Sequence, residues 1–279
     1  MTGIYSFMDM LLPFDWANHL FMKNALLGVL LVTPIFGLLG TMVVNNRMAF
    51  FSDAIGHSAL TGIAIGVLLG FGQPLWSMIV FSALLALAIM AVKRANTAST
   101  DTIIGVFSST AVALGVVLLS RSGGFTKYSS FLIGDLLSIN STDLVMLSFT
   151  FVVVIVLWFL LFNKLLVVSV NPSLARSRGI RVNLYETVFS VMTAVVVTIS
   201  IQWVGVLIIS SLLVLPAAGA RNIAHNSRQY HFFAVIIALV SGVSGLIASY
   251  YWDTASGATI VLIIAIIFAV TFAFKRVRR

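Results

Sequence analysis

The chain has 279 residues, of which 60% are hydrophobic and only 9% are charged. A soluble domain carries about 25% charged residues, so this composition excludes an ordinary soluble protein and indicates an all-α, polytopic membrane bundle. The sequence contains no cysteine, which excludes disulfides, thiolate metal ligands and cysteine nucleophiles. The net charge of +8 is better explained by basic loops that set membrane topology than by a nucleic-acid partner.

The N-terminal segment does not have the pattern of a signal peptide. Residues 1–20 include Asp9 and Asp15 but no lysine or arginine, so the basic start of such a peptide is missing. Acidic residues beside Trp16 instead predict an interfacial segment at the membrane surface. We expect residues 1–279 to form a single transmembrane domain that begins with this segment.

Nine apolar runs of about 20 residues are long enough to cross a hydrocarbon core about 30 Å thick. In chain order these predicted spans are Phe21–Val44, Met48–Gly70, Leu75–Val92, Thr102–Ser120, Leu144–Phe162, Leu184–Ile201, Trp203–Arg221, His231–Tyr251 and Gly257–Phe274. Tyr128–Asn140 is apolar but shorter, and it contains Gly134 and Asp135. We expect it to form a re-entrant or half-length helix buried in protein. The sequence alone leaves eight or nine spans open.

Basic residues predict the orientation of these spans. With the N-terminus outside, thirteen basic residues lie in the cytoplasm, and only Lys23, Arg121 and Lys127 lie outside. The inverted arrangement reverses the two numbers. Because cytoplasmic loops carry an excess of lysine and arginine, we expect a cytoplasmic C-terminus.

The longest polar stretch on the predicted cytoplasmic side is residues 163–183, where we expect a short helix. Asn171 is a good N-cap and Pro172 suits the first turn. Gly179 is a good stop signal. Such a helix suits either docking of a soluble partner or a plain connection, and the residues alone favour neither.

Asp53 and His57 carry the strongest functional signal in the chain. They are four residues apart inside the predicted span Met48–Gly70, so both side chains leave the same face of one helix. Ionisable residues within a membrane span are costly and indicate a functional site. A transient site for a divalent metal is the favoured interpretation, while a structural pair and a proton relay are the alternatives. Carboxylate and imidazole ligands suit zinc, manganese or ferrous iron better than magnesium.

The same span carries two further patterns. Thr61 extends the polar stripe by one turn, and Gly62, Gly66 and Gly70 form an opposing stripe of small residues. Small residues at this spacing allow close packing of helices, so we expect this helix in the protein interior. His57 lies about 15 Å from the start of the span near Arg47, which predicts a site close to the membrane midplane.

The remaining ionisable residues in or beside spans are expected to have structural roles. Asp101 and Glu186 fit the first turns of their helices, where acids are favoured, and Asp253 fits an outer turn. Asp135 is expected to be buried in the half-length helix, and the sequence does not decide whether it joins a metal pathway. We expect solvated side chains rather than metal ligands at the three other histidines, His19, His225 and His231.

Several catalytic motifs are missing. None of the five lysines is followed by serine or threonine, so the chain has no P-loop and cannot bind ATP in that manner. It also lacks His-Glu-x-x-His and Gly-x-Ser-x-Gly, the commonest signals for hydrolysis. We therefore predict that this chain is not an enzyme.

Five sequence blocks resemble the bacterial manganese/zinc/iron ABC-transporter permeases, the ABC-3 family, in family order and spacing. These blocks are Arg47–Gly62, Asp101–Gly105, Gly134–Leu137, Val204–Ala220 and Asp253–Gly257. The resemblance covers the chain from about residue 20 to the C-terminus. One departure is Ala255, which stands where the family often has proline, in a predicted outer turn.

This resemblance implies a permease subunit that imports zinc, manganese or ferrous iron as cargo, with no permanently bound cofactor. Its partners would be a cytoplasmic ATP-binding subunit dimer, an extracytoplasmic metal-binding protein, a second permease copy and membrane lipid. It would lie in the bacterial cell membrane and work by alternating access. An ATP-independent secondary transporter or channel is the alternative. The sequence chooses neither the metal nor a homodimer over a heterodimer.

The resemblance also assigns residues. It places Asp53 and His57 on the metal pathway, and it matches the predicted cytoplasmic helix to the family's coupling helix, which seats in the ATPase. The residues that would dock there are Pro172, Ser173, Ala175, Arg176, Arg178 and Gly179.

Overall fold

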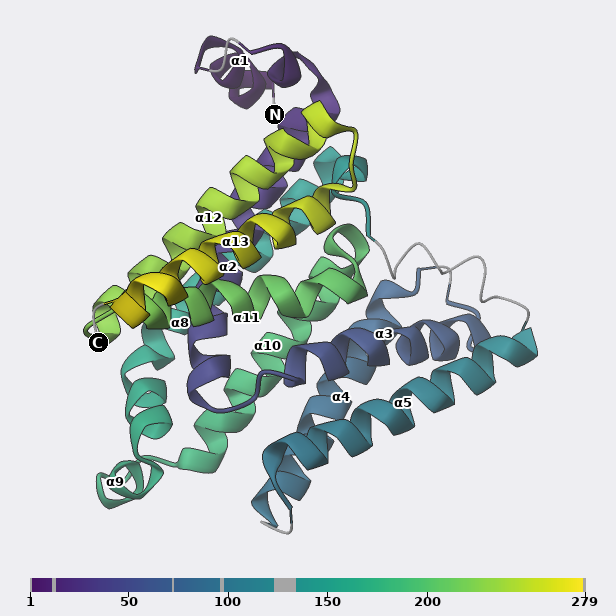
Figure 1. Cartoon of the computed structure of the whole chain (residues 1–279). Helices are drawn as coiled ribbons and strands as arrows, with labels where there is room; N and C mark the ends of the chain where they lie inside the picture. Colours follow the sequence, from purple (N-terminus) through teal and green to yellow (C-terminus); the bar gives the residue numbers. More distant parts are fainter. Residues whose placement is uncertain (1, 12–13, 72, 96–97, 123–133, 278–279) are drawn as a thin grey trace. The chain divides into compact units, whose positions relative to one another are not determined.

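A computed structural model describes residues 2–11, 14–71, 73–95, 98–122 and 134–277, and every regular element in these ranges is a helix (Figure 1). Within this part of the chain, eight helices are long and apolar enough to cross a membrane, judged by length and composition. They are α2 (Leu20–Asn45), α3 (Phe51–Leu68), α4 (Leu75–Arg94), α5 (Thr100–Ser122), α8 (Ser141–Val170), α10 (Val182–Val204), α12 (Ser227–Trp252) and α13 (Ser256–Val277). The prediction of an all-α, polytopic membrane bundle is confirmed.

The seventh of the nine predicted spans, Trp203–Arg221, corresponds to a shorter apolar helix. Trp203 belongs to α10, whose C-cap is Gly205 at φ +86°. The next helix, α11, covers Val206–Ile223. A φ in this region is readily adopted by glycine and rarely by other residues. The break therefore comes from Gly205, within a sequence that is apolar on both sides.

The predicted polar loop 163–183 is largely helical. Helix α8 continues to Val170, eight residues beyond the predicted end of its span at Phe162. A short helix, α9, covers Pro172–Ser177, and α10 begins at Val182. Asn163 and Lys164 thus lie on a helix, because single polar residues do not stop a helix whose other positions are apolar.

The helices pack into two compact units. One unit comprises Met42–Ile133 and Val156–Ser210, and it contains α3, α4, α5, α9 and α10. In this unit α3 packs against both α4 and α5, and α10 packs against α4 and α3 (Figure 1). Its helix α3 holds both predicted metal ligands.

The other unit comprises Met1–Thr41, Gly134–Ile155 and Ser211–Arg279. Here α12 contacts α2 and α13 through glycines. A Cβ added at Gly242 would lie 2.7 Å from Thr33 of α2, and one at Gly245 would lie 2.6 Å from the Ile260 Cα of α13. These close approaches bring the three helices together as tightly as membrane helices with small interfacial residues do.

The N-terminal segment folds as helix α1 (Thr2–Leu11) followed by a 3-10 turn, η1 (Asp15–Asn18). It is tied to α2 by an ion pair between Asp9 and Lys23. Tyr5 also donates a hydrogen bond to the Asn24 side chain at 2.7 Å. The predicted location of this segment at the membrane surface stays a prediction, as does the division of the chain into a single domain.

The predicted half-length helix Tyr128–Asn140 lies in part outside the described residues, which resume at Gly134. Between Gly134 and the start of α8 at Ser141, the chain forms a short 3-10 turn, η2 (Leu136–Ser138). The prediction that Asp135 is buried is wrong, because its side chain is exposed. It accepts a hydrogen bond from the Leu137 backbone N–H at 3.0 Å, which is the usual role of aspartate beside a turn.

Candidate metal site

Helix α3 begins one turn after a tight reversal of the chain. Arg47 adopts φ +55° in this reversal, and the Met48 N–H donates a hydrogen bond to Val43 O at 2.9 Å. Asp53 is the third and His57 the seventh of the 18 residues in α3. The aspartate therefore lies in the first turn, where the helix dipole favours a negative charge. The pair occupies the first half of the helix, and its predicted depth at the midplane stays a prediction.

The two side chains lie close together, as their spacing predicts. His57 Nε2 is 3.5 Å from Asp53 Oδ1, and the side chains retain 31% and 42% of their exposure, respectively. Ligand atoms bound 2.0–2.2 Å from a tetrahedral ion are about 3.4 Å apart. The observed separation therefore suits either a direct ion pair or two ligands of one metal ion.

Ser210 of α11 completes this cluster, and the sequence analysis did not select it. Its hydroxyl donates a hydrogen bond to Asp53 Oδ1 at 3.2 Å. Gly56 of α3, which lies between the two polar residues in the sequence, faces α11. A Cβ at Gly56 would meet Val206 at 3.4 Å and Ile209 at 3.5 Å. A serine in an otherwise apolar run was the signal that could have identified this contact.

Two protein ligands are too few for a closed four-coordinate site. Within the described ranges, no group of three or more His, Cys, Asp or Glu side chains could hold a metal ion. Because the pair is partly exposed, water molecules can supply further ligands. This arrangement suits a transient site better than a structural one.

Thr61 does not belong to the site. Its side chain is fully buried, and its hydroxyl donates to the Ala111 carbonyl of α5. The predicted polar stripe therefore ends at His57, and Thr61 helps to join α3 to α5. The predicted glycine stripe is confirmed at Gly62 and Gly66, which face Met78 and Ser77 of α4.

Gly70 has a different role, since it lies beyond the end of α3 at φ +76° with no neighbouring atom within 4 Å of an added Cβ. It belongs to the turn that leaves the helix, and does not extend the packing stripe.

His231 differs from its predicted solvated state. Its side chain is buried at 7% exposure, and Nδ1 lies 2.6 Å from the Thr41 hydroxyl. The basic loop before α12 suggested solvent, but α12 packs against α2 at this position and buries the His231 side chain. His19 and His225 are exposed, as predicted.

Asp101 has the structural role predicted for it, whereas the prediction that Glu186 lies in the first turn of its helix is wrong, because α10 begins at Val182 and Glu186 is its fifth residue. Asp101 lies in the first turn of α5, where Ser99 provides the cap. Glu186 forms an ion pair with Lys93 at 3.5 Å. Asp253 ends α12 in the left-handed conformation at φ +50°.

The predicted cytoplasmic helix is present as α9. The Asn171 side chain accepts a hydrogen bond from the Leu174 N–H at 3.0 Å, and Gly179 turns the chain at φ +74°. Ala175 is fully buried against Val168 and Val182. The other predicted docking residues are exposed, namely Pro172, Ser173, Arg176, Arg178 and Gly179.

Comparison with known proteins matches residues 18–275 to the ABC 3 transport family. The chain belongs to this family. It is 34% identical over 255 residues to the high-affinity zinc uptake system membrane protein ZnuB of Haemophilus influenzae, covering 91% of this chain and 97% of the relative. It is 31% identical over 252 residues to the manganese import system permease protein ScaB of Streptococcus parasanguinis, covering 90% of each.

A solved structure has the same fold as this ABC 3 family member. It is PsaBC from Streptococcus pneumoniae in complex with Fab, with a TM-score of 0.79 and 29% identity, covering 98% of this chain and 95% of that chain. The predicted family is thereby confirmed. The chain is a multi-pass transport subunit, and the prediction that it is not an enzyme is confirmed by the nature of its relatives.

Proposed function

We propose that this chain is the membrane permease of an ATP-driven importer whose cargo is Zn²⁺ or Mn²⁺. The observation that carries the proposal is the Asp53–His57 pair, with ligand atoms 3.5 Å apart and partly exposed on a largely buried helix. The chain also belongs to a transport family whose relatives are named for zinc uptake and for manganese import. Both metals accept carboxylate and imidazole ligands.

The pair would bind the cation transiently during transport rather than hold it permanently. A divalent ion loses its hydration on entering a membrane protein, at a large cost in free energy. Asp53 supplies a negative charge, His57 supplies a nitrogen ligand, and Ser210 keeps the carboxylate oriented. With water in the other positions, the ion is stabilised enough to enter and weakly enough to leave.

Energy would come from separate subunits. The chain has no P-loop, so we assign ATP hydrolysis to a cytoplasmic ATP-binding dimer and delivery of the metal to an extracytoplasmic binding protein. Two permease copies would form the pathway, which would open alternately to each side of the cell membrane. The exposed residues of α9, with Arg176 and Arg178 among them, would dock on the ATPase.

The test is uptake of radioactive zinc and manganese into proteoliposomes that contain the permease, its ATPase and its binding protein. We expect ATP-dependent uptake of one metal, lost in His57→Ala and in Asp53→Asn. His225→Ala is the matched control, because His225 is an exposed histidine in a loop, and it should transport normally.

Two results would contradict the proposal at different levels. Uptake that needs no ATP would show a secondary transporter or channel. Normal uptake by both site variants would restrict Asp53 and His57 to a structural role and leave transport by another route.

A further inference from the structure

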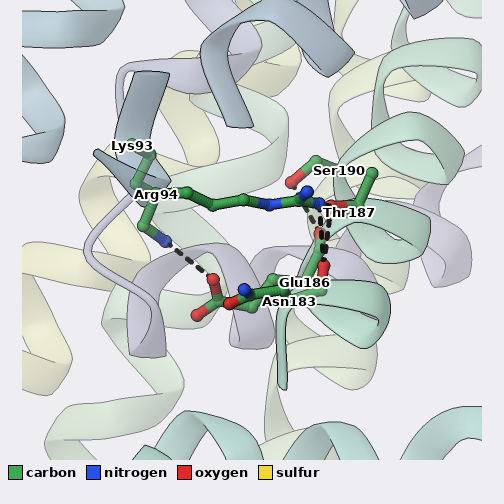
Figure 2. A network of polar contacts seen from close by, with 6 residues as sticks. All are labelled: Lys93, Arg94, Asn183, Glu186, Thr187 and Ser190. Atoms are coloured by element: carbon green, nitrogen blue, oxygen red, sulfur yellow. Dashed lines mark hydrogen bonds and ion pairs between the residues drawn. The ribbon is translucent and has the colours of Figure 1, made fainter. Parts of the chain in front are cut away.

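Helix α4 ends against the beginning of α10 in a network of polar contacts (Figure 2). Lys93 Nζ lies 3.5 Å from Glu186 Oε2, and the two side chains are about four-fifths buried, at 20% and 19% exposure. Arg94, the last residue of α4, donates to the Thr187 hydroxyl at 2.5 Å and to the Asn183 carbonyl at 3.3 Å. We call these five residues the α4–α10 clamp.

The clamp lies close in sequence to the proposed docking helix. Only four residues separate the end of α9 at Ser177 from the start of α10 at Val182. Ala175 of α9 is buried against Val182 of α10, and the Ile180 N–H donates to the Ala175 carbonyl at 3.0 Å. A movement of α9 would therefore displace the first turns of α10, which contain the clamp residues Asn183, Glu186 and Thr187.

The other side of the clamp leads to the metal pair. Helix α4 packs on α3 at Gly62 and Gly66, where a Cβ at Gly62 would lie 2.6 Å from the Met78 Cα. Backbones this close move together, because there is no side chain between them to repack. Helix α3 carries Asp53 and His57, so α9, α10, α4 and α3 form a continuous packed series within one compact unit.

The preference of helix ends for particular charges does not by itself explain the charge pairing between α4 and α10. Lys93 and Arg94 in the last turn of α4 are favoured by the dipole of that helix, whereas Glu186 lies beyond the first turn of α10. Those local effects do not require the two helices to meet, whereas the largely buried Lys93–Glu186 pair and the two Arg94 contacts fix one helix end on the other.

We propose that Lys93, Arg94 and Glu186 are positioning residues that couple the ATPase-driven movement of α9 to α3 and its metal pair. The inference rests on the proposed function, since it assumes that α9 docks on an ATPase. Weakening the clamp should leave the complex assembled and hydrolysing ATP, while fewer metal ions cross for each ATP consumed.

The experiment measures ATP hydrolysis and metal uptake in the same proteoliposomes for wild type, Glu186→Gln and Thr187→Val. Coupling free energies between sites correspond to about 5-fold or larger effects. We expect the uptake per ATP to fall about 5-fold or more in Glu186→Gln, and to fall in Thr187→Val, which removes only the hydroxyl that accepts from Arg94. Asp101→Asn is the matched control, an exposed acid near the start of α5, and its ratio should equal that of wild type.

The charge swap Lys93→Glu with Glu186→Lys separates coupling from stability. It restores the ion pair but places a negative charge in the last turn of α4, which the dipole of that helix disfavours, so we expect part of the coupling to return even if the melting temperature stays low. An unchanged uptake-to-ATP ratio in Glu186→Gln and Thr187→Val would overturn the clamp proposal. Absence of ATP-dependent uptake in wild type would instead overturn the proposed function itself.

Discussion

Exposure distinguishes Asp53 and His57 from the other polar side chains of α3. Ser52, Ser58 and Thr61 are fully buried. The Ser58 hydroxyl donates to the Ile55 carbonyl at 2.8 Å, within the same helix, and the Thr61 hydroxyl donates to α5. Buried hydroxyls satisfied in this way stabilise the helix and its packing. The two ionisable residues keep part of their surface free, as a site that accepts and releases an ion requires.

Ser210 provides a test of orientation at the site. Replacing Ser210 by alanine removes the hydrogen bond to Asp53 Oδ1 without changing the charge of the pair. A hydrogen bond to a charged group contributes about 1.5–3 kcal/mol, and partial exposure reduces this value. We expect Ser210→Ala to weaken zinc or manganese binding by about 3- to 10-fold, measured by equilibrium dialysis of the purified permease.

Ser211→Ala is the matched control for this change. Ser211 follows directly in the same helix, and successive helical residues point about 100° apart. Loss of the Ser211 hydroxyl should therefore leave metal binding unchanged. Equal effects of the two substitutions, or no effect of either, would show that Ser210 does not orient Asp53.

The sequence predicted those parts of the site that depend on neighbours within one helix. Asp53 and His57 face each other because a four-residue spacing is one helical turn, whatever the tertiary structure. Ser210 comes from a helix more than 150 residues away in the chain, and His231 is buried by α2, so neither environment follows from local spacing. The apolar neighbours of Asp135 led to the prediction that it is buried, but its side chain lies beside a turn and is exposed.

At the scale of helices, glycine determines how closely two axes approach. Gly62 faces the Met78 backbone, whereas Gly105 in α5 has no neighbour within 4 Å of an added Cβ. The small-residue spacing predicted the first contact correctly, since only glycine leaves room for a backbone at that distance. The break at Gly205 was missed, because hydropathy is similar on its two sides.

This difference predicts opposite effects of one substitution at two positions. Gly62→Ala puts a methyl group 2.6 Å from the Met78 Cα, and backbone cannot yield as a side chain does, so we expect a loss of about 1–3 kcal/mol in stability. Gly105→Ala adds a better helix former in open space and should gain up to about 1 kcal/mol. Thermal unfolding of the two purified variants in detergent measures both changes, and equal melting temperatures would contradict the packing at Gly62.

At the scale of the whole molecule, the side of the membrane on which each loop lies is predicted from charge rather than from packing. Arg176, Arg178, Arg228 and the C-terminal basic residues would share the cytoplasmic side, and the connection between α12 and α13 would lie outside. Hydropathy alone fixes the order of spans but not their direction, since a reversed chain has the same apolar runs. The excess of lysine and arginine supplies the direction.

The lack of native cysteine allows this orientation to be tested with one thiol at a time. Ser177 at the end of α9 and Ala255 between α12 and α13 are both exposed. With a membrane-impermeant maleimide on intact cells, we expect Ala255→Cys to react, because the distribution of basic residues predicts that its turn faces outward. Ser177→Cys should react only after permeabilisation, and less when the ATPase is co-expressed and covers α9. Labelling of Ser177→Cys from outside would reverse the topology, and with it the assignment of α9 as the docking helix.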